Sequence, residues 1–343
     1  MTGPLICDIA GLELDNSDRS RLQNSLVGGV ILFSRNYESP QQLKRLTAEL
    51  HDLRKQPLLI SVDHEGGRVQ RFRDGLQIIP PMRQIGNYYQ KNPQAALEFS
   101  TLTGWLMATE LLAYGVDLSF APILDVGDAV SDVIGDRAFH EDPEIISQLT
   151  KSWVAGMNEA GMAAVGKHFP GHGSVKGDSH HLIPVDDRPI EKIKARDLIP
   201  FKALCAHQIQ GIMMAHVIYS RVDEQPAGYS SIWIKNYLRD ALGFRGLVFS
   251  DDLSMRGAES AGGFAERARL SLSAGCDVLL VCNNPDGVDE VLDALDGYKN
   301  DALQARWNSF NKCQRKFDES VFQREKWLSA VLKLERFKQS FSD

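Results

Sequence analysis

The sequence predicts an α/β protein folded as a single (β/α)8 TIM barrel, and three observations support this prediction. Eight short apolar runs recur along the 343-residue chain, continuous or nearly so, as is typical of strands covered on both faces in a parallel sheet. Amphipathic helical stretches separate these runs, which is the alternation that such a barrel requires. Nearly every run also ends in a polar or ionisable residue, and barrels of this class form their active sites at the carboxyl ends of the strands.

The predicted elements follow one another in a regular order. The strands are LICDIAG, VGGVILF, PLLISVDH, VDLSFAPILDV, AAVGKHF, GIMMAHVIY, GLVFSDD and DVLLVCNN. The intervening helices are expected over residues 41–53, 94–114, 144–160, 190–206 and 231–242. Pro93 stands near a helix start, and glycines stand where helices should end. These glycines are Gly115, Gly161, Gly243 and Gly275.

The last part of the chain predicts helices that close the barrel, with no second domain. After Asn284 the sequence holds two amphipathic stretches, residues 288–295 and 299–337, and no Pro/Ser-rich linker divides the chain. We therefore expect residues 1–343 to form one domain. A doubly wound sheet with a small cap is the alternative, because periodicity alone does not distinguish an open parallel sheet from a closed one.

Composition points to a small-molecule partner. The net charge of −7 argues against nucleic-acid binding, because neutralising phosphates requires a basic face. The five cysteines are scattered and form no C-x-x-C pair, so neither a disulfide framework nor a zinc knuckle is indicated. The start of the chain has no basic region ahead of an apolar run, and no uncharged apolar run reaches membrane-spanning length. We expect a cytoplasmic monomer that does not bind membranes.

Polar residues at the predicted strand ends are the candidates for an active site. They are Asp8, Arg35, Asn36, Asp63, Glu65, Asp125, Lys167, His168, His216, Asp251, Asp252, Asn283 and Asn284. For Asn283 and Asn284 a role in a turn is the simpler interpretation, because asparagine often begins turns.

The stretch KHFPGHGSVKGDSHH, residues 167–181, is unusually rich in histidine and glycine. A metal site at His168 and His172 is disfavoured, because Pro170 and the neighbouring glycines prevent the helix that would place both on one face. A phosphate-binding nest around Lys176 lacks a P-loop or dinucleotide motif. A Schiff base on Lys167 stays open as an alternative.

Asp178 and His180 in this stretch could form an acid/base pair. In an extended segment, residues two apart point to the same side, so the carboxylate could hold one ring nitrogen while the other faces a pocket. Such a pair suits a group that gives and takes a proton near neutral pH. The alternative, that His180 is an ordinary surface histidine, stays open on this evidence.

Several blocks together resemble glycoside hydrolase family 3, and in particular its bacterial β-N-acetylglucosaminidases. They are KHFPGHGSVKGDSH, VDHEGGRVQRF, GDRAFHEDP and VFSDDLSM, and the likeness runs from Gly28 to Asn284. The resemblance implies a retaining hydrolase that removes N-acetylglucosamine from muropeptides in cell-wall recycling, with no metal or organic cofactor. One departure is His64, where family members commonly carry glutamine.

The resemblance also implies the residue roles. It makes Asp251 the nucleophile and His180, oriented by Asp178, the acid/base. The sequence itself does not choose between Asp251 and Asp252, because neighbours on a strand point opposite ways and both are carboxylates. The residues expected to hold the sugar hydroxyls are Asp63, Arg71, Arg137, Lys167 and His168. Glu65 is interpreted as a structural partner, and His216 and Asp125 as further members of the pocket. Met255 could line the sugar site, but packing is the more common role of a buried methionine.

Overall fold

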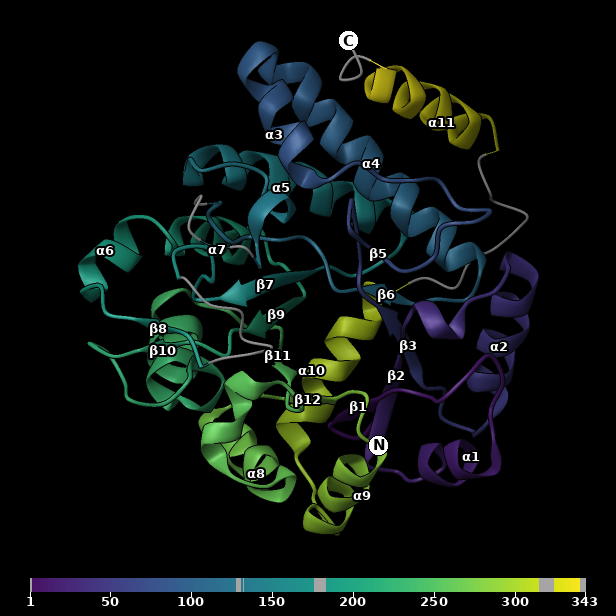
Figure 1. The fold of residues 1–343 in the computed structure, drawn as a ribbon, viewed down its shortest axis with the longest axis vertical. Coiled ribbons are helices and arrows are strands. Elements are labelled where there is room, and N and C mark those ends of the chain that lie inside the picture. Colours follow the sequence, from purple (N-terminus) through teal and green to yellow (C-terminus); the bar gives the residue numbers. More distant parts are fainter. Residues whose placement is uncertain (1, 128–130, 132, 176–182, 315–323, 340–343) are drawn as a thin grey trace.

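The computed structural model describes residues 2–127, 131, 133–175, 183–314 and 324–339 of the chain. Its centre is an eight-stranded parallel sheet in the order β6-β3-β2-β1-β12-β11-β9-β7, surrounded by helices (Figure 1). These strands are β1 Leu5–Cys7, β2 Val27–Leu32, β3 Leu59–Val62, β6 Leu118–Ser119, β7 Val165–Phe169, β9 Gly211–Met214, β11 Leu247–Asp252 and β12 Val278–Val281. Each lies within one of the eight predicted apolar runs, so the strand prediction is confirmed.

The sheet closes into a barrel through the chain that follows β6. Ile123 forms a parallel bridge with Lys167 on β7. The Leu124 N–H donates to the Lys167 carbonyl at 2.7 Å, and the Val165 N–H donates to the Ala121 carbonyl at 2.9 Å. The first and last strands of the sheet are thereby joined, which confirms the barrel and excludes the open, doubly wound alternative.

The helices agree with the prediction for most of the chain. They are α1 Asn16–Leu22, α2 Pro40–Asp52, α3 Met82–Lys91, α4 Pro93–Ala113, α5 Pro143–Ala160, α6 Ile190–Ala195, α7 Leu198–Ala206, α8 Phe264–Ala274, α9 Pro285–Ala294, α10 Asp301–Lys312 and α11 Arg324–Gln339. The predicted helix over 231–242 is a π-helix, Ile232–Ala241. The predicted helix over 190–206 is divided at Arg196, because Pro200 cannot donate a backbone hydrogen bond and is tolerated only in the first turn of a new helix.

Two short two-stranded sheets lie outside the barrel. The strands β4 His64–Gly66 and β5 Val69–Gln70 form an antiparallel hairpin directly after β3. Gly66 and Gly67 make its turn at φ +106° and +56°, and a Cβ on Gly66 would lie 2.6 Å from the Pro80 carbonyl oxygen. A side chain is therefore excluded at Gly66. In the second sheet, β8 Val185–Asp186 pairs with β10 Ile218–Tyr219.

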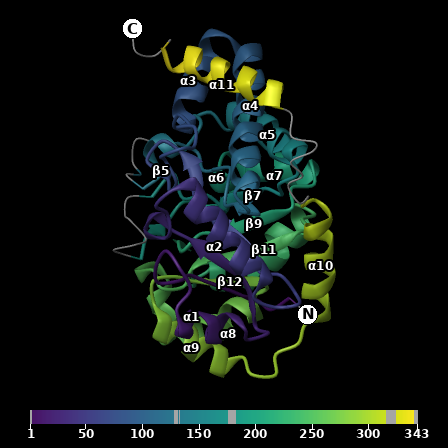
Figure 2. The same cartoon turned by 90° about the vertical axis from the view of Figure 1, so that its right-hand side faces the viewer.

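The helix α10 closes the amino-terminal end of the barrel. Its apolar residues Leu303, Trp307 and Phe310 are buried against side chains from the barrel interior, among them Phe249. Figure 2 shows α10 on the opposite side of the strands from β5, which leaves the carboxyl ends of the strands uncovered by this helix. The predicted closing role of the tail is therefore confirmed for α10.

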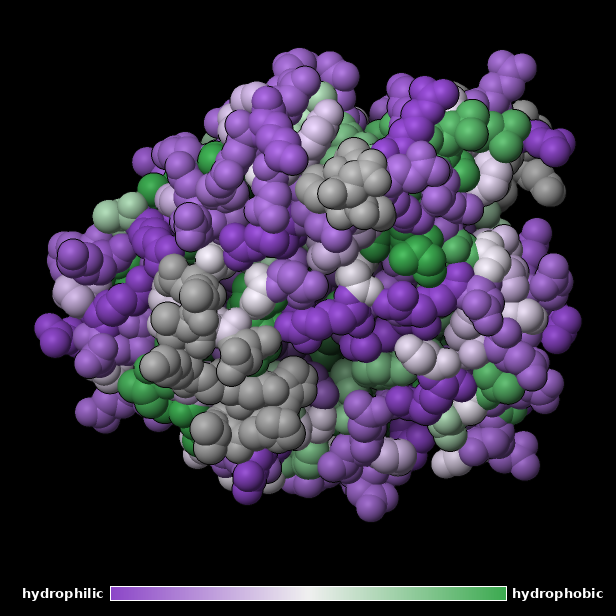
Figure 3. Space-filling model, turned by 45° about the horizontal axis from the view of Figure 1, so that its top comes forward, coloured by the Kyte–Doolittle hydropathy of each residue, from purple (hydrophilic) through white to green (hydrophobic). Residues whose placement is uncertain are grey.

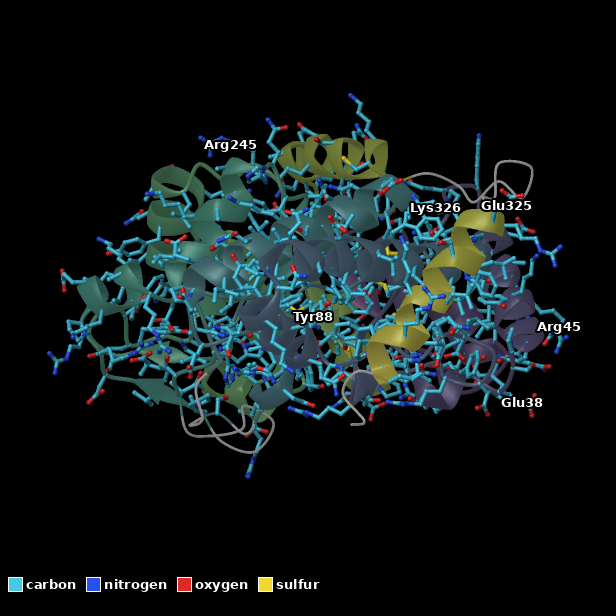
Figure 4. The ribbon with its side chains drawn as sticks, turned by 90° about the horizontal axis from the view of Figure 1, so that it is seen from above. Glu38, Arg45, Tyr88, Arg245, Glu325 and Lys326 are labelled. Carbon is cyan, nitrogen blue, oxygen red and sulfur yellow. The ribbon has the colours of Figure 1, made fainter. Side chains whose placement is uncertain are left out.

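The helix α11 packs elsewhere, against α3 and α4. Phe337 stacks on Phe99 with ring centroids 3.7 Å apart, and the Lys326 ammonium lies 4.3 Å from the centroid of the Trp105 ring. Figure 4 shows α11 lying across this side of the molecule, with Glu325 and Lys326 at its start. The second stretch of the tail thus extends the helical layer and does not close the barrel.

Candidate active site

Side chains from distant parts of the chain meet at the carboxyl ends of the strands. Asp63 follows β3, Lys167 and His168 lie on β7, His216 follows β9, and Asp251 is on β11. The grouping expected from parallel strands is therefore present in the structure. Figure 3 shows one face of the molecule, where hydrophilic residues predominate and apolar residues form separate small patches.

Lys167 connects two carboxylates beside β3. Its Nζ lies 2.6 Å from Oδ1 of Asp63 and 2.7 Å from Oε1 of Glu65, and its side chain is 2% exposed. Burial alone would lower the pKa of Lys167, but Asp63 and Glu65 raise it above its ordinary value. The amine is therefore held as an ammonium ion. An imine-forming lysine must be deprotonated, so these ion pairs oppose the Schiff-base alternative.

Arg137 joins the same network from the turn Gly135–Arg137. Its Nε and Nη2 each donate to Glu65 at 2.8 Å. Burial alone would raise the pKa of Glu65, but Arg137 and Lys167 hold it well below its usual range. Glu65 is thus an ionised carboxylate that forms ion pairs with two cations. This agrees with its interpretation as a structural partner.

Arg71 lies at the outer edge of this network. Its Nη2 is 3.9 Å from Oδ2 of Asp63, and its guanidinium carbon is 5.7 Å from the centroid of the Phe33 ring. The Asp63 side chain is 23% exposed, whereas the carboxylate of Glu65 is 2% exposed. Asp63 and Arg71 are therefore the most exposed members of the network.

His168 is oriented by the fully buried Asp125. The ring Nδ1 lies 2.7 Å from Oδ2 of Asp125. The same carboxylate accepts the backbone N–H of His168 at 3.2 Å, and its Oδ1 accepts the backbone N–H of His172 at 2.6 Å. Burial alone would raise the pKa of Asp125, but His168 and the His172 hydrogen bond lower it. Because an ionised carboxylate only accepts, Nδ1 carries a proton and Nε2 is the ring nitrogen left for a ligand. Sequence reasoning missed the part played by the His172 backbone.

Asp251 and Asp252 have different surroundings. The Asp252 Oδ1 accepts the N–H groups of Ser254 at 2.9 Å and Cys282 at 3.0 Å, and its Oδ2 accepts the Ser254 hydroxyl at 2.6 Å. Burial raises the pKa of Asp252 to about 6. For Asp251, burial also acts to raise the pKa, but His168, the Asp252 N–H and Lys167 lower it below its ordinary value. The Asp252 carboxylate is thus held by its own loop and by the end of β12, whereas Asp251 is an ionised carboxylate among cationic and polar groups.

Other strand-end residues form a separate cluster or a turn. Arg35 pairs with Asp8 and donates to Asn283 at 2.8 Å. Asn283 adopts φ +57°, and the Asn284 side chain accepts the Gly287 N–H at 2.8 Å at the start of α9. Asn284 therefore caps α9 and Asn283 lies in the bend before it, which agrees with a structural role for both. Met255 is buried, at 8% exposure.

The predicted acid/base pair, Asp178 and His180, lies outside the described residues. Within the described ranges, no three His, Cys, Asp or Glu side chains converge as metal ligands. Over the same part of the chain, no helix is both long enough and apolar enough to cross a membrane.

The sequence and the structure are both similar to those of known glycoside hydrolases. Residues 7–308 match the family model described as the glycosyl hydrolase family 3 N terminal domain. A beta-hexosaminidase from Thiobacillus denitrificans is 56% identical over 294 residues, covering 86% of this chain and 82% of that protein. Another, from Methylobacillus flagellatus, is 53% identical over 290 residues, covering 84% and 83%. The crystal structure of NagZ from Neisseria gonorrhoeae in complex with N-trifluoroacetyl-D-glucosamine has 42% identity, a TM-score of 0.91 and 98% coverage of both chains. The family match includes Asp63, Lys167, His168, His216 and Asp251.

Proposed function

The chain belongs to glycosyl hydrolase family 3 and is a β-N-acetylhexosaminidase, and from this premise we propose that it is a retaining exo-β-N-acetylglucosaminidase. Its proposed substrates are peptidoglycan fragments, anhydro-muropeptides with a terminal N-acetylglucosamine, and its proposed role is cytoplasmic peptidoglycan recycling as a monomer. The observation that carries the mechanism is the contrast between Asp251, whose pKa is lowered, and Asp252, whose carboxylate oxygens accept hydrogen bonds from Ser254 and Cys282.

In the first step, an oxygen of Asp251 attacks the anomeric carbon as the bond to the leaving group breaks. The transition state resembles an oxocarbenium ion, and the product is a covalent glycosyl-aspartate. An ionised carboxylate is needed here, because a protonated one is a weak nucleophile. The lowered pKa of Asp251 supports this role.

Proton transfer is assigned to His180, with Asp178 orienting its ring. The imidazolium gives its proton to the leaving oxygen in the first step and, as the neutral ring, takes a proton from water in the second. That water opens the glycosyl-aspartate, restores Asp251 and releases the sugar with retained configuration. This assignment rests on the family resemblance and on the spacing of the two residues in the sequence.

The sugar hydroxyls are assigned to the charged groups around Lys167. Charged donors and acceptors form stronger hydrogen bonds than neutral ones, and a hexose offers mainly hydroxyls. Asp63, Lys167, Arg71 and Arg137 form one ion-paired network, and His168 is fixed by Asp125, so these groups are held in place before substrate binds. The complex of the Neisseria NagZ with an N-acylated glucosamine supports the choice of sugar.

The neighbouring aspartates provide the main test of the nucleophile. We expect Asp251→Asn to remove hydrolysis of a chromogenic β-N-acetylglucosaminide, with or without chelator, and Asp252→Asn to serve as the matched control that retains turnover. A slow fluorinated glycoside should form an adduct that mass spectrometry maps to the peptide containing Asp251. An adduct on another peptide, or full turnover by Asp251→Asn, would contradict the assignment.

The acid/base is tested separately with leaving groups of different acidity. A poor leaving group needs protonation and a good one does not, so His180→Ala should slow hydrolysis of alkyl glycosides far more than that of nitrophenyl glycosides. Asp178→Ala should show the same pattern more weakly. Equal slowing of both substrate classes would show that His180 does not protonate the leaving group.

A further inference from the structure

His216 follows β9 and is completely buried. Its Nε2 lies 3.0 Å from the backbone carbonyl oxygen of Asp252. A carbonyl only accepts hydrogen bonds, so Nε2 carries the proton. The other ring nitrogen, Nδ1, is buried and has no hydrogen-bond partner among the described residues. Burial lowers the pKa of His216, which agrees with a neutral ring. The ring therefore donates one hydrogen bond, from Nε2, which connects the residue after β9 to the end of β11.

The hydrogen bond from His216 lies just beyond the point where the pairing of β9 with β11 ends. The pairing of β9 with β11 stops at Met213 and Phe249, three residues before Asp252. On the other side, Asp252 is still paired with Leu280 of β12, and the Leu253 N–H donates to the Leu280 carbonyl at 2.8 Å. The end of β11 is thus supported by backbone hydrogen bonds on the β12 side. On the β9 side, the His216 side chain supplies the hydrogen bond that the strand backbone no longer makes.

Asp252 in turn forms a hydrogen bond with the carboxylate of Asp251. Its backbone N–H donates to Oδ1 of Asp251 at 2.8 Å. The Asp252 carboxylate is held by Ser254 and Cys282. The carbonyl is held by His216, so each polar group of Asp252 has a partner. The orientation of the Asp251 carboxylate therefore depends on where the Asp252 backbone is held.

We propose that His216 is a positioning residue for the nucleophile: by holding the Asp252 carbonyl it fixes the N–H that binds Oδ1 of Asp251, so that Oδ2 is presented to the anomeric carbon. This inference rests on the proposed role of Asp251. The ring is completely buried and acts through the Asp252 backbone, so its loss should slow the attack of Asp251 and leave substrate binding nearly unchanged.

Three variants separate this role from packing. His216→Leu fills similar space without a donor, and His216→Gln places an amide N–H where it can reach the Asp252 carbonyl. Gly228→Ala is the matched packing control, because its added Cβ would lie 3.8 Å from the His216 Nδ1 in ordinary contact and would leave the Nε2 donor in place. The measurement is the first-order rate constant for labelling by a slow fluorinated glycoside, together with its dissociation constant.

We expect His216→Leu to slow labelling by about 100-fold, the order of loss that a small misplacement of a reacting group produces, with a nearly unchanged dissociation constant. His216→Gln should recover most of the rate, and Gly228→Ala should match the wild type. If His216→Leu does not fold, the shorter His216→Asn takes its place, and it should label much more slowly than His216→Gln.

The outcomes distinguish this inference from the assignment of the nucleophile. Adduct on Asp251 with equal labelling rates for the donor-lacking and donor-retaining variants overturns the role of His216 alone. A change confined to the dissociation constant overturns it as well. Adduct on a peptide without Asp251 in the wild type overturns the nucleophile and, with it, this inference.

Discussion

Glu65 accepts two hydrogen bonds from the Arg137 guanidinium at 2.8 Å and pairs with the Lys167 ammonium at 2.7 Å. The carboxylate is 2% exposed, and the two cations come from a turn and from a barrel strand that lie far apart in the sequence. One buried anion therefore fixes two of the groups proposed to bind the sugar. Removing it leaves the Arg137 guanidinium without its carboxylate partner and Lys167 with Asp63 alone.

Replacing Glu65 should affect stability and activity together. We expect Glu65→Ala to lower the free energy of unfolding by about 3–5 kcal/mol, the usual range for breaking a buried ion pair, and to reduce kcat/KM because Arg137 and Lys167 lose their positions. Urea denaturation and steady-state kinetics measure the two effects. Glu49→Gln is the control, since Glu49 pairs with Arg19 near the surface and should cost no more than about 1 kcal/mol. Wild-type stability in Glu65→Ala would contradict a structural role for this carboxylate.

Most of the fold and the location of the site could be predicted from sequence. Strands buried on both faces appear as continuous apolar runs, and parallel strands bring their carboxyl ends to one edge. The polar residues at the predicted strand ends therefore included Asp63, Lys167, His168 and Asp251, which lie together in the structure. Arg137 was expected only through the family resemblance, because it lies on a short turn with no strand pattern.

Other features depended on distant contacts that periodicity does not encode. The barrel closes through hydrogen bonds between residues 121–124 and β7, more than forty positions along the chain. The two aspartates at the end of β11 differ because Ser254 and Cys282 bind only the second one. The two aspartates therefore differ in their hydrogen-bond partners in the folded protein, and two adjacent aspartates in a sequence give no sign of this difference.

Asp63 is proposed to bind sugar hydroxyls, so its charge should matter for activity. Asp63→Asn removes a charged acceptor, and a hydrogen bond to a charged group contributes about 1.5–3 kcal/mol, so kcat/KM should fall about 10- to 100-fold. Asp8→Asn is the matched control, because Asp8 also lies at a strand end but pairs with Arg35 in the separate cluster. Steady-state kinetics on a chromogenic N-acetylglucosaminide give both values. Equal losses in the two variants would show that Asp63 has no special contact with substrate.

His64 should make stability depend on pH. Burial, with Arg73 and Arg71 nearby, lowers the pKa of His64 to about 3, and the ring is 2% exposed. Because this folded-state pKa lies below the unfolded value near 6.5, the unfolded state binds the proton first. The contribution of the neutral ring is complete above pH 6.5 and is lost as the pH falls from 6.5 toward 3. At pH 5 the loss amounts to about 2 kcal/mol.

Glutamine, the residue that the family resemblance leads us to expect at this position, provides the test. We expect the difference in free energy of unfolding between pH 7.5 and pH 5 to be about 2 kcal/mol smaller in His64→Gln than in the wild type, since glutamine does not titrate. Urea denaturation at the two pH values measures this difference. His207→Gln changes an exposed histidine and should leave the wild-type difference intact. A wild-type difference in His64→Gln would show that another group causes the pH dependence.

The helix α11 should stabilise the protein without affecting catalysis. Phe337 is buried between α11 and its neighbours, stacked 3.7 Å from Phe99 and edge-on at 5.3 Å from Tyr88, which Figure 4 labels beside α11. Truncating a buried aromatic ring costs about 3–5 kcal/mol, so Phe337→Ala should lower the free energy of unfolding by about 3 kcal/mol. Because α11 packs on α3 and α4 and contributes no residue to the network around Lys167, kcat/KM should stay within about twofold of the wild type at a temperature where the variant is folded. Leu332→Ala on the same helix is the matched control, since its side chain is 61% exposed and the change should stay within about 0.5 kcal/mol. A large fall in kcat/KM in folded Phe337→Ala would show instead that α11 is coupled to the strand ends through α4.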